Sequence, residues 1–472
     1  MLGLLNRQLN LFFMPLAEQV ISFQHPILDP IDSVLDDDEL LGLVTDLLAS
    51  RYPKSTKTGR PGMAPDRLLR SCVLKHTMDW SFRTLEAELK MNLVYRRFTH
   101  FDEDRIPNIS TFSRNFALLG EEGTKKIHER VAELAQKEGV TRGNRLRTDT
   151  TVIETNIHYP SDSSLLGDGI RVLTRALTRI RSEVEAGAVS ITDHARATTR
   201  RIIEISRAAR GTSQAARDRM LESYRKLIAL ASGVVRETED TLEKLAANSI
   251  LITGSLLTVT AQEEELRHFL PLVQKVISQT EERLFEGNRH VKGKIISIFE
   301  PHSVPIRKGK PHKPTEFGRL FRIDEVEGGI ISGYEVLDGN PADTNAWKTA
   351  LDGHVEMFDR PPYMATADRG YFSAENERYA EDIGVKRVAL PGRGRLSQSR
   401  AATQKERWFR RASRWRNGVE ARIAILKNVF GLHCACYKGD TGVKRHAGWA
   451  VIANNLSAIA RYKNKRSKDC DD

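Results

Sequence analysis

The stretch that decides the fold is Tyr363-Met-Ala-Thr-Ala367, with Ser373-Ala-Glu-Asn-Glu-Arg-Tyr-Ala-Glu-Asp-Ile383 and Val385-Lys-Arg-Val-Ala-Leu390 after it. The outer runs are short and mostly apolar, as buried strands are. The middle run is typical of a helix that ends before Gly384, where a left-handed cap is wanted. A strand, a helix and a strand in this order form a βαβ unit with parallel strands. The sequence therefore predicts an α/β protein whose sheet is at least partly parallel.

Further strands are expected on the N-terminal side of this unit. The run Arg145-Leu-Arg-Thr-Asp-Thr-Thr-Val-Ile153 has a high β propensity. Residues 317–326 and 329–336 are predicted to form two strands around the turn Val326-Glu-Gly-Gly329, and Lys294-Ile-Ile-Ser-Ile-Phe299 a short β-branched strand. These runs extend the predicted sheet.

The stretch between about residues 165 and 286 has a different composition. It is rich in Arg, Glu, Ala and Leu, nearly free of Pro and poor in aromatic residues. Apolar residues such as Ile202, Ile203 and Ile205 keep helical spacing. Long helices in an antiparallel hairpin or a small bundle are expected here. Because strand-like runs lie on both sides, this stretch is interpreted as an insertion in the α/β domain.

The N-terminal stretch is predicted to be helical. Helices are expected within residues 27–50, from Pro65, after Ser81 and after Ser110, with the two serines as N-caps. A basic loop, Lys54-Ser-Thr-Lys-Thr-Gly-Arg-Pro-Gly62, precedes Pro65. Short helices joined by polar and basic turns are typical of a helix-turn-helix DNA-binding unit. An ordinary small helical bundle would give the same pattern.

These patterns predict three domains. The boundaries expected are residues 1–135 for a helical N-terminal DNA-binding domain, 140–164 with 288–462 for the α/β domain, and 165–287 for the helical insertion.

The composition restricts the class of partner. The chain has 472 residues, and its 73 Lys and Arg outnumber its 62 Asp and Glu, so the formal net charge is +11. A positive charge favours an acidic polymer such as nucleic acid. The four cysteines are too few and too scattered for a disulfide framework, and the N-terminal apolar patches are too short for a signal peptide or membrane span. We expect a cytoplasmic protein without a membrane partner.

Three acidic residues stand out as candidate ligands. Asp149 lies inside a predicted strand, where a carboxylate is costly to bury unless it is paired or bound to a metal ion. Asp368 follows the predicted strand 363–367, and the carboxyl ends of parallel strands are where open α/β sheets place ligands. A solvated aspartate at a strand end or turn would have the same sequence pattern.

The third acid, Glu420, belongs to a helical run expected from about Asn417 to Phe430. At about 100° per residue, Arg416, Glu420 and Lys427 fall on one polar stripe beside the apolar face. An acid between two cations on one stripe can be a surface ion-pair ladder. It can also be a metal-binding carboxylate flanked by cations that bind phosphate.

Phosphodiester cleavage connects the three acids. It needs a water made nucleophilic and a stabilised leaving oxygen, and two divalent ions about 4 Å apart supply both. Mg²⁺ prefers oxygen ligands, so three carboxylates suit it better than a thiolate cage would.

The chain resembles a family, the bacterial insertion-sequence transposases of the DDE class. Their end-binding domain is similar to Arg60-Pro-Gly-Met-Ala-Pro-Asp-Arg-Leu-Leu-Arg70, Trp80-Ser-Phe-Arg-Thr-Leu-Glu86 and Ser110-Thr-Phe-Ser-Arg114. Their two aspartate blocks are similar to Thr148-Asp-Thr-Thr-Val-Ile-Glu-Thr-Asn-Ile-His-Tyr-Pro-Ser-Asp162 and Ala367-Asp-Arg-Gly-Tyr371. Their Tyr-x2-Arg-x3-Glu-x6-Lys signature is met by Arg416, Glu420 and Lys427, with Ser413 at the tyrosine position.

The resemblance spans roughly residues 55–165 and 290–460 and implies both fold and function. It implies an RNase H-like mixed sheet with flanking helices, besides the all-α N-terminal domain and the helical insertion. It implies a transposase that hydrolyses phosphodiester bonds at transposon ends and joins the strands to target DNA, with Asp149, Asp368 and Glu420 binding Mg²⁺ or Mn²⁺, two ions in all. The partners implied are the terminal inverted repeats and target DNA, bound by a homodimer near the bacterial nucleoid.

The resemblance and the basic composition together predict the residues that contact DNA. These are Arg416 and Lys427 near the scissile bond, and Arg410, Arg411, Arg414, Arg60, Arg83 and Arg114. Tryptophan and phenylalanine residues interleave the basic residues between Gly392 and Trp415, and such aromatics can stack on an unpaired base. A solvated charge run over a small hydrophobic anchor is the alternative.

Three other functions are compatible with parts of the sequence. A nuclease on the same fold would need the three acids but no joining of strands. A domesticated DNA-binding protein would bind DNA without cutting it, and the presence of all three acids argues against it. A helical scaffold would explain residues 165–286 and leave the acidic and basic blocks unexplained.

Overall fold

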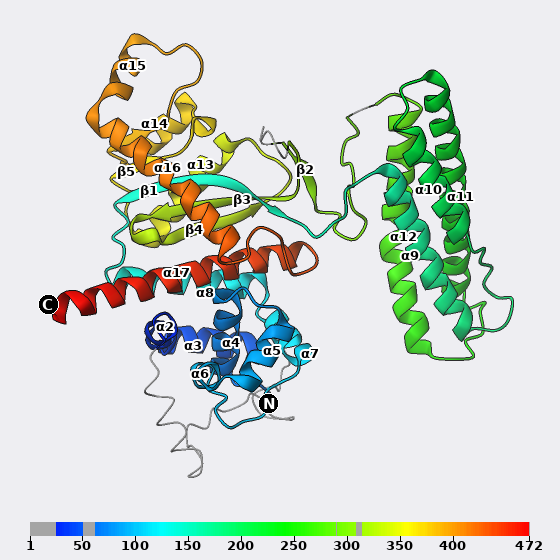
Figure 1. Cartoon of the computed structure of the whole chain (residues 1–472), viewed down its shortest axis with the longest axis horizontal. Coiled ribbons are helices and arrows are strands. Elements are labelled where there is room, and N and C mark those ends of the chain that lie inside the picture. Colours follow the sequence, from blue (N-terminus) through cyan, green and yellow to red (C-terminus); the bar gives the residue numbers. More distant parts are fainter. Residues whose placement is uncertain (1–24, 51–61, 289, 308–313, 472) are drawn as a thin grey trace. The chain divides into compact units, whose positions relative to one another are not determined.

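The structure is a computed structural model that describes residues 25–50, 62–288, 290–307 and 314–471. It consists of two compact units, which we call the core unit (Met1–Thr155 with Lys308–Asp472) and the helical unit (Asn156–Arg307) (Figure 1). In the described residues no helix is both long enough and apolar enough to cross a membrane.

The core unit contains a mixed sheet. Its strands are β1 (Arg145–Glu154), β3 (Glu316–Val326), β4 (Ile331–Leu337), β5 (Met364–Thr366) and β6 (Arg387–Ala389). They run in the order β4-β3-β1-β5-β6. β1 is antiparallel to β3 and β3 to β4, whereas β1, β5 and β6 are parallel. The predicted βαβ unit is thus confirmed, and so is the α/β class with the mixed RNase H-like sheet.

Two helices pack on opposite faces of β1 because its side chains alternate. Odd-numbered residues such as Ile153 face α16 (Arg407–Asn428), whose Val419 and Leu426 join the same apolar cluster. Leu146 faces the other way and shares a cluster with Trp347 of α13 (Asp343–Phe358). The βαβ helix is α14 (Ala374–Asp382), followed by Gly384 at φ +99°, and α15 (Gln398–Lys405) precedes α16.

The N-terminal helices pack on the sheet through the last helix, α17 (Asp440–Asp471). They are α2 (Leu28–Leu35), α3 (Asp38–Ala49), α4 (Pro65–Thr77), α5 (Phe82–Met91), α6 (Leu93–Phe98), α7 (Ile109–Leu118) and α8 (Gly120–Lys137). Along α17, Val443 and Ala447 pack with the sheet, whereas Trp449 and Ile452 share the cluster of the N-terminal helices. In Figure 1, α17 accordingly runs between the sheet and these helices.

The predicted cap is present on one of two N-terminal helices and absent from the other. Ser81 caps α5 as expected, because its hydroxyl accepts a hydrogen bond from the N–H of Thr84 at 3.0 Å. The expected cap at Ser110 is wrong. Asn108 caps α7 instead by accepting from the N–H of Thr111 at 2.9 Å, so the helix begins at Ile109 and Ser110 lies in its first turn.

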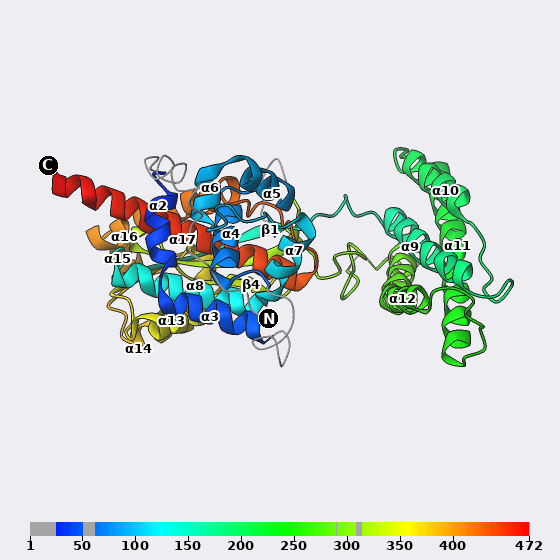
Figure 2. The same ribbon diagram turned by 90° about the horizontal axis from the view of Figure 1, so that it is seen from below.

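The helical unit is a bundle of four helices. They are α9 (Asp162–Glu183), α10 (Ala195–Ala208), α11 (Gln214–Ala246) and α12 (Leu256–Leu284), and a short strand, β2 (Val304–Ile306), follows. Both views show α9 to α12 side by side (Figures 1 and 2). Long helices in a small bundle are therefore confirmed for this stretch.

The strand expected at Lys294–Phe299 is wrong. No strand forms over these residues, although they are β-branched. Instead Ile295 and Ile298 are buried in the apolar core of the bundle. The side chain of Gln279 bonds both backbone groups of Ile295, accepting from its N–H and donating to its carbonyl at 2.9 Å each. The helical unit therefore continues past the end of α12, because α12 supplies the hydrogen bonds that a neighbouring strand would otherwise supply.

Three buried histidines should make the stability of the core unit depend on pH. Each has Nε2 within 3.0 Å of a backbone carbonyl, His128 of Ile331, His354 of Gly143 and His446 of Gly431. Burial lowers the pKa of each to about 4, below the ordinary value of 6.5. Between these values the unfolded chain binds more protons than the folded one, so the free energy of unfolding decreases as pH falls.

We expect this free energy, measured by urea denaturation, to fall from pH 6.5 toward pH 4 by up to about 1.4 kcal/mol per pH unit for each histidine. His128→Gln keeps a donor for the carbonyl of Ile331 but does not titrate, so its curve should be flatter. An identical pH dependence in this variant and the wild type would contradict the assignment.

Candidate active site

Asp149 lies in the middle of β1, opposite Ile323 of β3. It has an odd number, so its side chain lies on the face that α16 covers. The side chain is 14% exposed, and Oδ1 accepts a hydrogen bond from the N–H of Thr150 at 2.7 Å. A largely buried carboxylate of this kind requires positive charge nearby.

Asp368 follows β5, the strand that lies parallel beside β1. It caps the short 3₁₀ helix η2 (Arg369–Tyr371), since Oδ1 accepts from the N–H of Gly370 at 2.6 Å. β5 runs in the same direction as β1 and ends at Thr366, opposite Arg147 of β1. Asp368, two residues after Thr366, therefore lies beside the part of β1 that contains Asp149, two residues after Arg147.

Glu420 lies on α16, which begins at Arg407, ten residues before the start that the apolar spacing predicts. Its side chain is 74% exposed. About one turn before Glu420, a hydrogen bond joins α16 to the sheet: the buried Arg147 of β1 donates to the carbonyl of Trp415. Arg147 also pairs with Glu325 of β3 at 2.7 Å. Gly418 is required there, because a Cβ would lie 2.5 Å from a guanidinium nitrogen of Arg147. The contact of Arg147 with Trp415 and Gly418 determines which residues of α16 face Asp149.

All three acids meet at one cation, the guanidinium of Arg416. Nη2 of Arg416 lies 3.4 Å from Oδ2 of Asp149 and 3.9 Å from Oδ2 of Asp368, and Nη1 lies 3.8 Å from Oε1 of Glu420. Residues that are up to 271 positions apart in the sequence are thus gathered within reach of a group only a few ångströms wide. In this arrangement Arg416 neutralises part of the charge of the three carboxylates.

The donor atoms of the three acids are of the type that divalent cations bind. Oxygen is the only donor type that the three acids offer, which suits Mg²⁺ or Mn²⁺. Within the described part of the chain, no three His, Cys, Asp or Glu side chains are spaced closely enough to hold a metal ion as they stand. The guanidinium of Arg416 lies between the carboxylates, and its Nε is buried without a hydrogen-bond partner in the described residues. The carboxylate oxygens therefore suit Mg²⁺ or Mn²⁺. For all three acids to bind one group of ions, the guanidinium of Arg416 must move out from between them.

A fourth carboxylate, Asp343, was missed by the sequence analysis. It is in the first turn of α13, and its Oδ1 accepts from the hydroxyl of Thr150 at 3.1 Å. A Cβ on Gly370 would lie 2.7 Å from an oxygen of both Asp343 and Asp368, so only glycine fits between them. The sequence carries no signal for this acid, because an aspartate at a helix start is most often a structural residue.

Tyr371 lies behind these acids and is fully buried. Burial, together with the negative charges of Asp343 and Asp149, raises the pKa of its hydroxyl well above the ordinary value. The hydroxyl therefore stays protonated and adds no charge to the site.

A cavity of about 270 Å³ opens beside Asp368. Ser413 and Arg416 of α16 line it, opposite Arg369 and Pro391. Ser413 is the residue that stands where the resembling enzymes have a tyrosine. The smaller side chain leaves this space open beside the acids.

The predicted DNA-contacting residues differ in how exposed their side chains are. Arg410, Arg411 and Arg414 are exposed along α16, and Arg83 and Arg114 are exposed on α5 and α7. Lys427 is half-buried on α16. Arg416 points into the acids, and Arg60 lies outside the described residues.

The last residues of the first-aspartate block, from Asn156 to Asp162, belong to the helical unit. His158 pairs with Asp168 at 2.6 Å, and this hydrogen bond raises its pKa. Asp162 is buried at the start of α9 beside Arg283 and Lys294, and Tyr159 is 80% exposed. The partners of His158 and Asp162 are thus charged side chains of the helical unit.

Comparison with known families gave two matches. Residues 16–118 match a transposase domain of the DUF772 family, and residues 325–456 match a transposase DDE domain. The second match includes Asp368 and Glu420, whereas Asp149 and the helical unit lie outside both matched stretches. No curated protein and no solved structure gave a significant match to the chain.

Proposed function

Because this chain is an insertion-sequence transposase of the DDE class, we propose that it hydrolyses phosphodiester bonds at transposon ends and joins the freed strands to target DNA. Asp149, Asp368 and Glu420 are the proposed catalytic acids, and Mg²⁺ or Mn²⁺, two ions, the proposed cofactor. The proposed localisation is the bacterial cytoplasm, in association with the nucleoid.

The observation that supports the proposal most is the meeting of three acids at Arg416. Two of them come from strands at one edge of a mixed sheet and one from the helix that crosses it. One guanidinium carries a single positive charge, so three carboxylates leave an excess of negative charge. Here Asp368 and Glu420 are 36% and 74% exposed, and Asp368 borders a cavity of about 270 Å³, as residues that bind a ligand do. The excess negative charge at a half-open site is what a site for divalent cations requires.

The residues of the chain have distinct proposed roles. Divalent ions bound by the acids would activate water and stabilise the leaving 3′ oxygen. Asp149, the most buried of the three, would hold the ions together with Asp368 and Glu420. Tyr371 would keep the floor of the site uncharged.

DNA binding is proposed to involve two surfaces of the core unit. The exposed arginines of α16 would bind the backbone phosphates next to the acids. The N-terminal helices, with Arg83 on α5 and Arg114 on α7, would bind the terminal repeats, as the match to a transposase domain over residues 16–118 supports. A homodimer would hold the two ends, and the helical unit is left without a proposed role.

The test uses the DNA that flanks the coding region. Short inverted repeats bracketed by direct duplications would identify the ends. A duplex with one such end should be cut by the full-length protein in Mg²⁺ and joined to a supercoiled target plasmid. Cutting without joining would identify a nuclease, and binding without cutting would identify a domesticated DNA-binding protein.

Arg416 should compete with divalent cations for the three acids. Arg416→Gln removes the positive charge, so Mn²⁺ titrated calorimetrically into the DNA-free protein should bind more tightly than to the wild type. The same variant should bind DNA more weakly and with a flatter salt dependence, because a phosphate contact is lost. Arg411→Gln, an exposed change on the same helix, is the control and should leave Mn²⁺ binding unchanged. Equal Mn²⁺ affinity in wild type and Arg416→Gln would refute the competition.

A further inference from the structure

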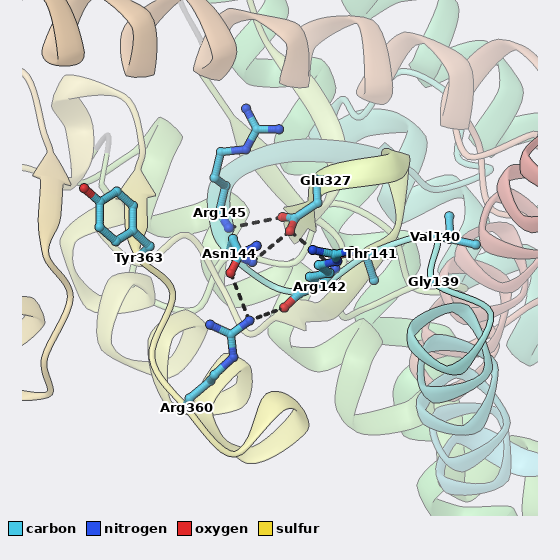
Figure 3. Close-up of a pocket in the computed structure, with 9 residues that line it drawn as sticks. All are labelled: Gly139, Val140, Thr141, Arg142, Asn144, Arg145, Glu327, Arg360 and Tyr363. Atoms are coloured by element: carbon cyan, nitrogen blue, oxygen red, sulfur yellow. Dashed lines mark hydrogen bonds between the residues drawn. The ribbon is translucent and has the colours of Figure 1, made fainter.

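A pocket of about 660 Å³ opens at the amino ends of β1 and β5, away from the three acids. Its walls include three arginines, Arg142, Arg145 and Arg360, with Tyr363 beside them (Figure 3). None of these residues belongs to the site described above. Arg142 and Arg145 are exposed, and Tyr363 is 51% exposed.

The acidic residue of the pocket, Glu327, is directed at the backbone. Its carboxylate accepts from the N–H of Asn144 at 2.8 Å, of Arg145 at 3.1 Å and of Arg142 at 3.3 Å. Figure 3 shows this carboxylate turned to the loop, while the side chain of Arg145 extends away from it. The loop is thereby held rigid, and the arginine side chains retain a net positive charge at its surface.

Arg360 is held in place by the same loop. Its guanidinium donates to the carbonyl of Arg142 and to Oδ1 of Asn144 at 3.0 Å. A guanidinium that is already oriented loses less conformational entropy when it binds an anion. The pocket therefore offers a preorganised cation beside two exposed ones, an arrangement that suits a phosphate.

Arg145, the pocket residue at the start of β1, lies on the same face of this strand as Asp149. Arg145, Arg147 and Asp149 alternate along the strand, and all three contact neighbouring residues of α16. The guanidinium carbons of Arg145 and Arg147 lie 5.2 and 4.7 Å from the ring centre of Trp415. At about 3.3 Å per residue, Arg145 is roughly 13 Å from Asp149 along the strand.

A second pair of cation–π contacts borders the pocket. Arg387 of β6 lies 5.8 Å from the ring of Tyr363 and 5.2 Å from the ring of Trp408. Arginine and aromatic side chains that alternate over a surface are typical of proteins that bind nucleic acid backbones. Arg145 with Trp415, and Arg387 with Tyr363 and Trp408, give the border of the pocket this character.

We propose that this pocket binds a backbone phosphate of the DNA that is being cut, about four nucleotides from the scissile phosphate. The spacing follows from the 13 Å along β1 and from the rise of about 3.4 Å per nucleotide in duplex DNA. The inference rests on the proposed function, since it takes the scissile phosphate to lie at Asp149. It adds a second contact that fixes the register of the DNA in the active site.

The test measures binding alone, with full-length protein in Ca²⁺ and fluorescent duplexes that carry the transposon end. The duplexes are shortened in steps of two base pairs from either side of the cleavage position. Wild-type affinity should drop when one side becomes shorter than about four nucleotides. Arg142→Gln should bind long duplexes more weakly, with a salt slope smaller by about 1, and should show no such drop.

Arg378→Gln is the matched control, because Arg378 is exposed on α14 and the charge change is the same. Its shortening series should match the wild type. The DNA assignment is overturned if Arg142→Gln and Arg378→Gln behave alike. It is also overturned if inorganic phosphate raises the melting temperature of the wild type but not of Arg142→Gln while both give the same shortening series, because the pocket would then take small phosphates. The binding test needs no cleavage. A wild-type protein that binds DNA but never cuts it would contradict the proposed function, and the shortening series would still show whether the pocket binds a DNA phosphate.

Discussion

Asp149→Asn is expected to lower strand cleavage by about three orders of magnitude or more and to leave DNA binding nearly intact. The amide has the shape of the carboxylate but no negative charge, so divalent cations lose the acid that lies at the centre of the site. The DNA-binding arginines of α16 are untouched, and Arg416 keeps Asp368 and Glu420 as partners. Cleavage is measured on an end-bearing duplex in Mg²⁺ and binding on the same duplex in Ca²⁺.

The matched control for this change is Asp382→Asn, which alters an exposed aspartate at the end of α14. It should cut at the wild-type rate. Glu420→Gln should repeat the result of Asp149→Asn, although Glu420 is the most exposed of the three acids. Normal cutting by either catalytic variant would remove that residue from the site.

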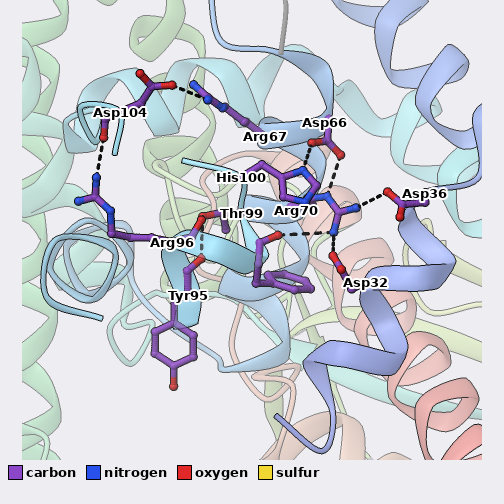
Figure 4. A network of polar contacts seen from close by, with 11 residues as sticks. Asp32, Asp36, Asp66, Arg67, Arg70, Tyr95, Arg96, Thr99, His100 and Asp104 are labelled. Carbon is purple, nitrogen blue, oxygen red and sulfur yellow. Dashed lines mark hydrogen bonds and ion pairs between the residues drawn. The ribbon is translucent and has the colours of Figure 1, made fainter. Parts of the chain in front are cut away.

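The second large effect concerns stability, and it arises at Arg70 in α4. This side chain is fully buried and pairs with Asp32, Asp36 and Asp66 (Figure 4). His100 holds the other oxygen of Asp66 at 2.6 Å. Burial acts to raise the pKa of Asp66, but the hydrogen bond from His100 and the charge of Arg70 outweigh it, so the pKa is lowered and Asp66 stays charged. One guanidinium thus joins α2 and α4.

Arg70→Met should therefore decrease the free energy of unfolding by about 3–5 kcal/mol, the usual cost of removing one partner from a buried ion pair. Urea denaturation followed by circular dichroism measures this loss. Arg105→Met, a change of an exposed arginine in the same unit, should alter the free energy of unfolding by less than about 0.5 kcal/mol. A loss of similar size in both variants would show that the buried network is not the cause.

Much of the architecture could be predicted from local patterns. The strand predicted from the β propensity of residues 145–153, the turn at Val326–Gly329 and the strand–helix–strand of residues 363–390 each appear in the structure close to where they were expected. Such patterns are reliable because they report the periodicity of a single element. The stripe of Arg416 and Glu420 on α16 is of the same kind, since both side chains belong to one helix.

Local patterns failed where a distant partner decided the outcome. Lys294–Phe299 has the composition of a strand, but Gln279 and the core of the helical unit hold it in an irregular path. Asn108 takes the cap that was assigned to Ser110, because both are good capping residues two positions apart and the sequence does not rank them.

The sequence by itself determined the α/β class, the helical insertion and the three acids as candidates. Only the tertiary structure decided that Arg416 lies between those acids, that Asp343 stands beside Asp368, and that a basic pocket lies at the amino ends of β1 and β5. The physical reason is that helical and strand periods depend on neighbours a few residues away. The position of a charge relative to others depends on contacts between segments hundreds of residues apart, such as that of Arg416 with Asp149.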